Sequence, residues 1–198
     1  MIDALARELR ATSHVEILAV ALGLIYVLLI YRRQRLGWIA GAASSIIYVY
    51  LAARAHLPMQ SLLQFYYVVM SVYGWCNWTR TEGQLGGGIE RWPLRHHLLA
   101  GLAIALLSVL TAQVLRRETH AAWPYLDSLT TWTSLFATWL VARLKLENWL
   151  YWIAADSIMV YLFAAQGYPF SAALFLSYVT IAVFGFRAWL RRYRLQLA

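Results

Sequence analysis

The sequence predicts an all-α integral membrane protein of seven transmembrane helices in a single domain, residues 1–198. Hydrophobic residues make up 62% of the chain and charged residues only 13%, whereas soluble globular chains are nearer a quarter charged. The mean hydropathy is +0.56. Seven mostly apolar runs are each long enough to cross a bilayer as a helix, and none shows the alternating pattern of a barrel strand.

The seven predicted helices follow one another closely along the chain. They cover residues 15–31, 37–54, 58–78, 95–115, 125–142, 147–166 and 169–190. The longest connection, TRTEGQLGGGIERWP, contains a run of three glycines among acids and bases, which is typical of a flexible linker. The net charge of +8 lies in short clusters between the apolar runs. This pattern reports membrane topology and argues against a nucleic-acid partner.

Lys and Arg gather at one face of the predicted bundle. Twelve follow the odd-numbered helices, namely Arg32, Arg33, Arg35, Arg80, Arg91, Arg95, Arg143, Lys145, Arg187, Arg191, Arg192 and Arg194. The other face has only five, namely Arg7, Arg10, Arg54, Arg116 and Arg117. Because cytoplasmic loops carry the excess of basic residues, we expect the N-terminus outside and the C-terminus in the cytoplasm.

An internal repeat relates the two ends of the chain. A shift of 111 positions, as from Arg32 to Arg143, aligns identical residues without a gap. The other pairs are Trp38 and Trp149, Tyr50 and Tyr161, Pro58 and Pro169, Tyr67 and Tyr178, Gly74 and Gly185, Trp78 and Trp189, and Arg80 and Arg191. Residues 15–78 and 125–190 are therefore predicted to be parallel three-helix repeats joined by the linker helix 95–115. This 3+1+3 arrangement is found in the SWEET sugar carriers and places a substrate between the halves, near the bilayer midplane.

The third predicted helix carries a polar stripe. Seven residues lie within about 100 degrees of arc, namely Gln60, Gln64, Tyr67, Ser71, Gly74, Trp75 and Trp78. The second repeat has Ser171, Phe175 and Ala182 where the first has Gln60, Gln64 and Ser71, so the polar version belongs to one half. Gln64 and Tyr67 are candidate ligands for a carboxamide or for sugar hydroxyls. The alternative is hydrogen bonding between helices, worth about 0.6 kcal/mol on average in membranes.

The fourth helix begins with Arg95, His96 and His97, which lack a spaced third metal ligand. We therefore interpret them as a solvated interfacial cluster and expect no metal. The sequence contains no GxSxG, P-loop or HExxH motif, so we expect neither an enzyme nor a cofactor. The single cysteine, Cys76, excludes an internal disulfide.

The fifth helix places four polar residues on one face, with two tryptophans beside it. These are Asp127, Thr131, Ser134 and Thr138, beside Trp132 and Trp139. Thr131 and Thr138 are candidate substrate ligands, although Ser and Thr in membrane helices often bond only to their own backbone. Asp127 lies near the outer end, where it serves either as a helix cap or as an electrostatic attractant at an entrance.

The sixth helix begins with ENWLYWIAAD, residues 147–156. Asn148, Trp152, Asp156 and Trp149 fall at about 0, 40, 80 and 100 degrees and so share one face. An ionised carboxylate costs roughly 2.5 to 3.5 kcal/mol in lipid, so Asp156 should face protein or water. Indole faces attract cations, and the set fits an aromatic, positively charged solute. Alternatively, Trp149 is an interfacial anchor and Asp156 a structural hydrogen-bond partner.

With these residues, and with YGWCNW at 73–78 and its echo FGFRAW at 184–189, the chain resembles the PnuC family of bacterial vitamin transporters over essentially its whole length. The resemblance implies uptake of nicotinamide riboside by facilitated diffusion, a homotrimer, and a location in the bacterial inner (plasma) membrane. It also implies that Trp149 and Trp152 flank the base, that Asn148 and Gln64 bond its amide or ribose, and that Asp156 lies near the site. Thiamine and riboflavin carriers of the same family are alternatives, as is a non-transporting membrane scaffold.

Overall fold

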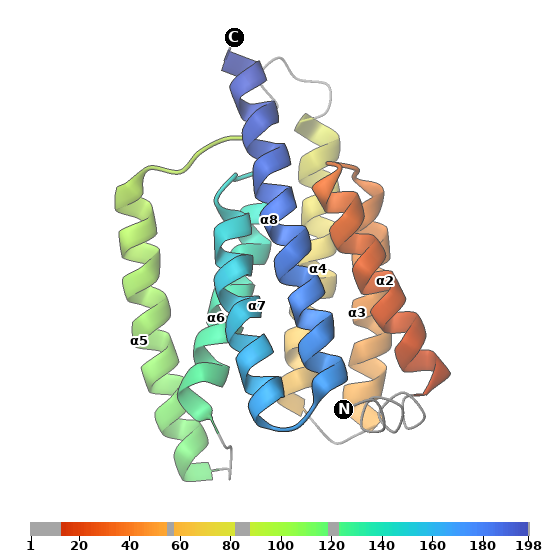
Figure 1. Ribbon diagram of the computed structural model, residues 1–198, viewed down its shortest axis with the longest axis vertical. Helices are drawn as coiled ribbons and strands as arrows, with labels where there is room; N and C mark the ends of the chain where they lie inside the picture. Colours follow the sequence, from red (N-terminus) through yellow and green to blue (C-terminus); the bar gives the residue numbers. More distant parts are fainter. Residues whose placement is uncertain (1–12, 55–57, 82–87, 119–122, 198) are drawn as a thin grey trace.

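The computed structural model describes residues 13–54, 58–81, 88–118 and 123–197. In this part the chain is all-helical, and seven helices run along the long axis of the molecule (Figure 1). They are α2 (His14–Tyr31), α3 (Leu36–Arg54), α4 (Pro58–Thr81), α5 (Leu94–Glu118), α6 (Pro124–Ala142), α7 (Asn148–Ala165) and α8 (Pro169–Leu197). The predicted bounds are confirmed to within a few residues, except that α8 extends to Leu197. Arg7 and Arg10 lie outside the described residues.

The helix starts follow from local chemistry. The Ser13 hydroxyl accepts a hydrogen bond from the Glu16 backbone N–H at 3.2 Å and so caps α2. Three later helices, α4, α6 and α8, begin with proline. Proline suits the first helical position because its missing N–H has no partner there and its φ is already helical.

Four of the described helices, α2, α3, α5 and α8, are long and apolar enough to cross a membrane by length and composition alone. The other three are more polar because α4, α6 and α7 carry the Gln, Thr and Asp side chains of a central cavity. The outer surface is apolar, as on α5, where Leu98, Leu102 and Leu106 are 66%, 69% and 58% exposed. Such leucines suit contact with lipid.

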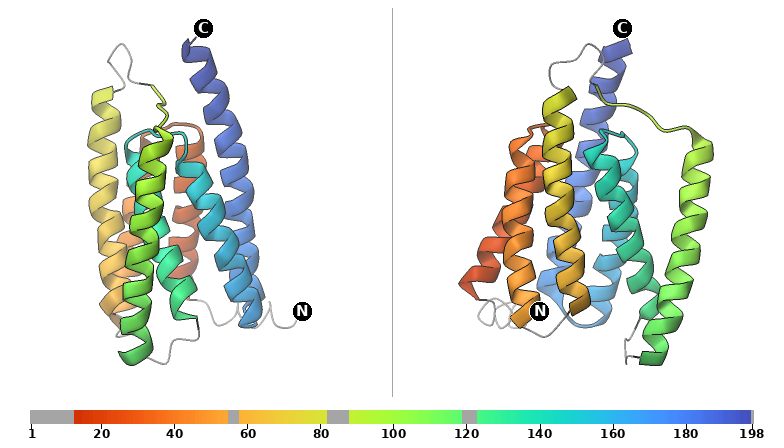
Figure 2. Two further views of the ribbon diagram at one scale, coloured as in Figure 1. Left: turned by 90° about the vertical axis from the view of Figure 1, so that its left-hand side faces the viewer. Right: turned by 180° about the vertical axis from the view of Figure 1, so that it is seen from behind.

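The helices form two groups of three with α5 at the edge (Figures 1 and 2). In one group α3 packs against both α2 and α4, and in the other α7 packs against both α6 and α8. Contacts of α4 with α6 and of α2 with α8 join the groups. Within the described residues, α5 packs along α6, and its first turn also contacts α7 through His97 and Tyr151. α5 therefore lies outside the bundle that encloses the cavity.

The turns after α2 and α6 have the same backbone conformation. Arg33 and Leu144 are 111 positions apart, and both have a left-handed φ, of 60° and 55°. The Arg33 N–H donates to the Ile30 carbonyl at 2.9 Å, and the Leu144 N–H donates to the Val141 carbonyl at 3.0 Å. Non-glycine residues avoid this region of φ. Its occurrence at two positions 111 residues apart is therefore a similarity of backbone conformation between the two groups, in addition to their identical residues.

The described part of the connection before α5 is held in place, contrary to the expectation of a flexible linker throughout. The Glu90 N–H donates to the Leu144 carbonyl at 3.0 Å, and the Leu146 N–H donates to the Glu90 carbonyl at 2.9 Å. The Lys145 ammonium also pairs with the Glu90 carboxylate. These contacts attach the chain before α5 to the turn between α6 and α7.

Candidate functional site

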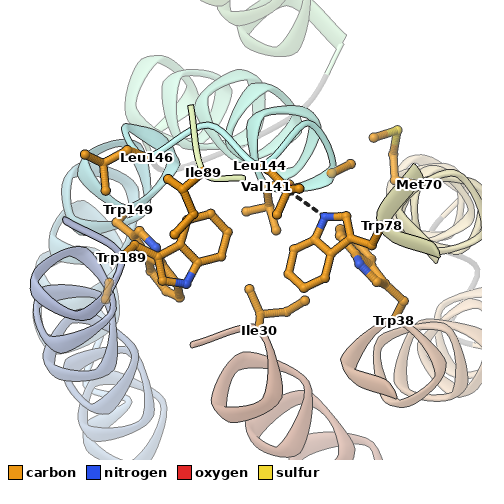
Figure 3. Packing of buried hydrophobic residues seen from close by; sticks show 12 residues of the cluster. Ile30, Trp38, Met70, Trp78, Ile89, Val141, Leu144, Leu146, Trp149 and Trp189 are labelled. Carbon is orange, nitrogen blue, oxygen red and sulfur yellow. Dashed lines mark hydrogen bonds between the residues drawn. The ribbon is translucent and has the colours of Figure 1, made fainter. Parts of the chain in front are cut away.

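Four indoles close one end of the space between the two groups of helices, and we call Trp38, Trp78, Trp149 and Trp189 the tryptophan floor (Figure 3). Trp38 meets Trp78 edge-to-face, at 5.5 Å between ring centroids and 88°. Trp149 meets Trp189 in the same way, at 5.6 Å and 86°. Trp78 and Trp189 are 6.0 Å apart and join the two pairs. Edge-to-face contacts of this kind add to simple burial.

Two reciprocal hydrogen bonds tie the floor to the opposite group. The Trp78 indole N–H, from α4, donates to the carbonyl of Val141 at the end of α6, at 3.2 Å. The Trp189 indole N–H, from α8, donates to the carbonyl of Tyr31 at the end of α2, also at 3.2 Å. Each group thus contributes one tryptophan whose indole N–H donates to the last turn of the other group's first helix, α6 for Trp78 and α2 for Trp189.

Two glycines let the other two indoles lie against the neighbouring helix. A Cβ on Gly74 would lie 2.4 Å from Trp38 Cε2, and a Cβ on Gly185 would lie 2.7 Å from Trp149 Cε3. Real Cβ contacts are essentially never so short. The predicted repeat aligns Gly74 with Gly185 and Trp38 with Trp149. In the structure each glycine contacts the tryptophan of its own half.

Above the floor lies a cavity of about 750 Å³, within the range of small-molecule sites. Its walls come from α2, α3, α4, α6, α7 and α8, and none of its lining belongs to α5. Trp38 and Trp149, at the floor, are 1% and 2% exposed. Gln60 and Asp127 are exposed residues of the lining near the starts of α4 and α6. The cavity is therefore most accessible at this second end, which we call the open end.

The cavity lining pairs residues from the two halves at the same 111-residue offset. Tyr67 and Tyr178 form one pair, and Glu16 and Asp127 form another. Other pairs differ in size or charge, as where Ser45 stands opposite Asp156 in the alignment. Residues at the 111-residue offset therefore line the cavity from both groups of helices, and some of these pairs are alike while others are not.

The lining is acidic. It contains the carboxylates Glu16, Asp127 and Asp156, and among the described residues that line it there is no Lys, Arg or His. Asp156 is 6% exposed and lies within electrostatic range of the Tyr67 and Tyr178 hydroxyls. No described Lys or Arg forms an ion pair with it. Asp156 is thus a buried carboxyl group without a basic partner among the described residues.

Trp149 and Trp152 occupy different environments, although both line the cavity. Trp149 is buried in the floor, where its ring contacts Trp189 and the backbone of Gly185. Trp152, one turn further along α7, is half-buried and forms no ring contact or hydrogen bond within the described part of the chain. Trp152 therefore lines the cavity as a partly buried indole that packs against the hydrophobic cluster of the floor without a ring-to-ring contact among the described residues.

Among the predicted polar ligands, Gln64, Tyr67 and Thr131 line the cavity and Gln64 forms no hydrogen bond to any described residue. Thr138 also lines it, but its hydroxyl donates to the Ser134 carbonyl of its own helix at 2.8 Å. Asn148 does not belong to the lining. It is fully buried, and its amide donates to the Lys145 carbonyl at 2.6 Å, so it supports the start of α7.

The histidines at the start of α5 contact protein and are not the solvated cluster that the sequence suggests. His96 stacks on Trp92 at 5.0 Å, and the His97 Nδ1 lies 3.0 Å from the Tyr151 hydroxyl. Glu147 accepts a hydrogen bond from the Trp92 backbone N–H at 3.2 Å. This contact network attaches α5 to α7. The described residues contain no group of three or more His, Cys, Asp or Glu placed to hold a metal.

Sequence reasoning missed Glu16, Tyr26 and Tyr178 as lining residues. The 111-residue offset marks two of them, since Tyr178 is the counterpart of Tyr67 and Glu16 that of Asp127. Tyr26 has no such signal because its counterpart is Ala137.

Comparisons with known proteins identify close matches in sequence and fold. A family model described as nicotinamide mononucleotide transporter matches residues 13–191. The riboflavin/roseoflavin transporter RibM of Streptomyces davaonensis is 27% identical over 179 residues, covering 87% of this chain and 83% of that protein. The nicotinamide riboside transporter PnuC of Escherichia coli is 25% identical over 208 residues, covering 92% and 87%. The crystal structure of the vitamin B3 transporter PnuC has the same fold, with a TM-score of 0.76 at 20% identity, covering 98% of this chain and 88% of that one.

Proposed function

The chain belongs to the nicotinamide mononucleotide transporter family and is a membrane transporter, not an enzyme; from this premise we propose that it carries nicotinamide riboside by facilitated diffusion through the central cavity. The observation that carries the proposal is the acidic lining, which has no basic residue among the described residues and includes the half-buried indole of Trp152. Nicotinamide riboside has a positively charged pyridinium ring. A cation is attracted both by carboxylates and by the face of an indole.

The charge of the lining argues against a phosphorylated substrate. A phosphate monoester carries close to two negative charges at neutral pH and would meet three carboxylates with no Lys or Arg to offset them. The nucleoside therefore fits the cavity better than the mononucleotide. Asp156 is the most buried of the three acids, at 6% exposed, and a cation bound beside it would favour its ionised form.

Riboflavin is the second candidate, since RibM is among the relatives. Its ring system is neutral, so it would gain nothing from the acidic lining, and the charge argument favours the pyridinium. Thiamine, also an aromatic cation, is the third candidate in the same class. A cavity of about 750 Å³ is roomy enough for each of the three.

For the transport step, we infer two parallel repeats, residues 15–78 and 125–190, that rock about the cavity with the helix of 95–115 as linker. The matching left-handed turns and the reciprocal bonds of Trp78 and Trp189 support this inference. The conformation described here would have the tryptophan floor closed. By the count of Lys and Arg the floor faces the cytoplasm and the open end faces outward. A homotrimer in the bacterial inner membrane completes the proposal and rests on the resemblance to the family.

The test is a titration of the purified protein with four compounds, followed by tryptophan fluorescence. We expect saturable quenching by nicotinamide riboside and none by its mononucleotide. In Trp152→Ala the quenching should disappear while the thermal unfolding temperature stays close to that of the wild type. A response to riboflavin or thiamine alone would reassign the substrate. Loss of folding in Trp152→Ala, without ligand binding by the wild type, would favour the scaffold interpretation.

A further inference from the structure

Tyr26 of α2 lies directly on the backbone of α3. A Cβ added to Gly41 would lie 2.8 Å from Cδ2 of Tyr26 and 3.2 Å from its Cε2. The ring is half-buried, lines the cavity, and meets Trp38 of the floor at 5.7 Å and 58°. Gly41 thus makes room for an aromatic ring that comes from the neighbouring helix.

In the second half the large and the small residue occupy the opposite positions of this pair. The counterparts of Tyr26 and Gly41 at the 111-residue offset are Ala137 and Trp152. Ala137 is fully buried, and Trp152 lines the cavity. In each half, therefore, one large aromatic and one small residue occupy this pair of positions. The ring comes from the first helix in one half and from the second helix in the other.

The positions of Gly41 and Trp152 have the same register relative to the floor. Gly41 follows Trp38 by three residues on α3, and Trp152 follows Trp149 by three residues on α7, so each position is about one helical turn from its floor tryptophan. The ring of Tyr26 lies against Gly41 and also meets Trp38. Each half thus contributes one aromatic ring to the cavity lining near the floor.

We propose that Tyr26 and Trp152 form an aromatic clamp, in which a positively charged ring binds with Trp152 on one side and Tyr26 on the other. The proposal rests on the proposed function and adds a second ring to the single indole on which that function depends. Ring faces attract a cation through their quadrupole, and the attraction grows when water is excluded between them. Asp156, one turn beyond Trp152, supplies the negative charge at the edge of the clamp.

The two rings of the clamp differ, because one half supplies a phenol and the other an indole. A phenol and an indole differ in width and in the position of their polar group, so the two walls present unlike edges to a bound ring. Tyr26 is in this sense a specificity-determining residue, since its removal would weaken the binding of cations more than that of neutral rings of the same shape.

The experiment compares nicotinamide riboside with its 1,4-dihydro form, which has nearly the same shape and a neutral ring. Affinities are measured by isothermal titration for the wild type, Tyr26→Phe, Tyr26→Leu and the control Tyr50→Leu, a 54% exposed residue outside the lining. In Tyr26→Leu we expect about a tenfold loss for the cation and less than about threefold for the neutral form. Tyr26→Phe and Tyr50→Leu should stay within about twofold of the wild type.

Should Tyr26→Leu not fold, phenylalanine analogues with successive fluorine substitutions at position 26 keep the ring and weaken its quadrupole. Affinity for the cation should then fall stepwise while that for the neutral form stays constant. Equal losses for both ligands, or none for either, would overturn the clamp and leave the carrier in place. If the wild type bound neither compound, the proposed function itself would fail, and the clamp with it.

Discussion

Gly185→Ala tests the packing that places Trp149 at the base of the cavity. The new Cβ would lie 2.7 Å from both Cε3 and Cζ3 of the indole. Trp149 is 2% exposed, and Trp189 holds its other side at a centroid distance of 5.6 Å. Forcing an extra methyl group into such a core costs about 1–3 kcal/mol.

The assay is thermal unfolding of the protein in detergent. For a chain of this length about 1 kcal/mol corresponds to roughly 2–4 °C in Tm, so Gly185→Ala should lower Tm by about 2–12 °C. Gly101→Ala is the matched control, because nothing lies within 4 Å of a Cβ at that position of α5. Since alanine is a better helix former than glycine, Tm of the control should be unchanged or slightly raised.

A second substitution separates the contact from other effects. In Gly185→Ala combined with Trp149→Phe, the smaller ring frees space for the methyl group, and part of the lost Tm should return. The packing argument would be refuted if Gly185→Ala unfolded within about 1 °C of the wild type, or if Gly101→Ala lost as much stability.

Three further predictions concern the floor, the attachment of α5 and the cavity. Trp78→Phe and Trp189→Phe each remove one of the two reciprocal hydrogen bonds. Each should cost about 0.6 kcal/mol for the lost hydrogen bond, in addition to the cost of the smaller ring. Unequal losses of Tm would contradict the equivalence of the two tryptophans. Glu147→Ala leaves the part-buried backbone N–H of Trp92 without its acceptor and should cost about 1 kcal/mol. Arg91→Ala should cost less because the Arg91 side chain is 61% exposed, and equal losses of Tm would contradict this ranking. Asp156→Asn should weaken nicotinamide riboside binding about tenfold and leave any riboflavin binding unchanged, and a parallel loss for both ligands in titrations would show that Asp156 acts only on structure.

Much of the fold follows from patterns within short stretches of the sequence. Apolar runs set the helix bounds because a bilayer requires that length, and proline at positions 58, 124 and 169 marks three helix starts. The 111-residue offset foretells that Gly74 and Gly185 have equivalent roles. It does not foretell that each glycine contacts a tryptophan of its own half, because this depends on how neighbouring helices cross.

The site was predicted less completely, for physical reasons. Helical angles place Asn148, Trp149 and Trp152 on one face of the helix but do not say how deeply each side chain is buried in the bundle. In the structure, Asn148 donates a hydrogen bond to the backbone, Trp149 packs in the floor, and Trp152 lines the cavity. Tyr26 escaped notice because its contact is with the backbone at Gly41, on another helix. The bridge from Glu90 to the turn after α6 joins residues 55 positions apart, and no local pattern marks such a contact.

Counterflow in liposomes tests most directly whether the acidic, aromatic cavity carries nicotinamide riboside. Liposomes loaded with unlabelled nicotinamide riboside receive the labelled compound outside, with the wild type, Trp152→Ala or no protein in the membrane. We expect rapid transient accumulation of label with the wild type alone, and we expect thiamine to compete more strongly than the mononucleotide. Absence of exchange by the wild type at any concentration, or undiminished exchange by folded Trp152→Ala, would contradict this expectation.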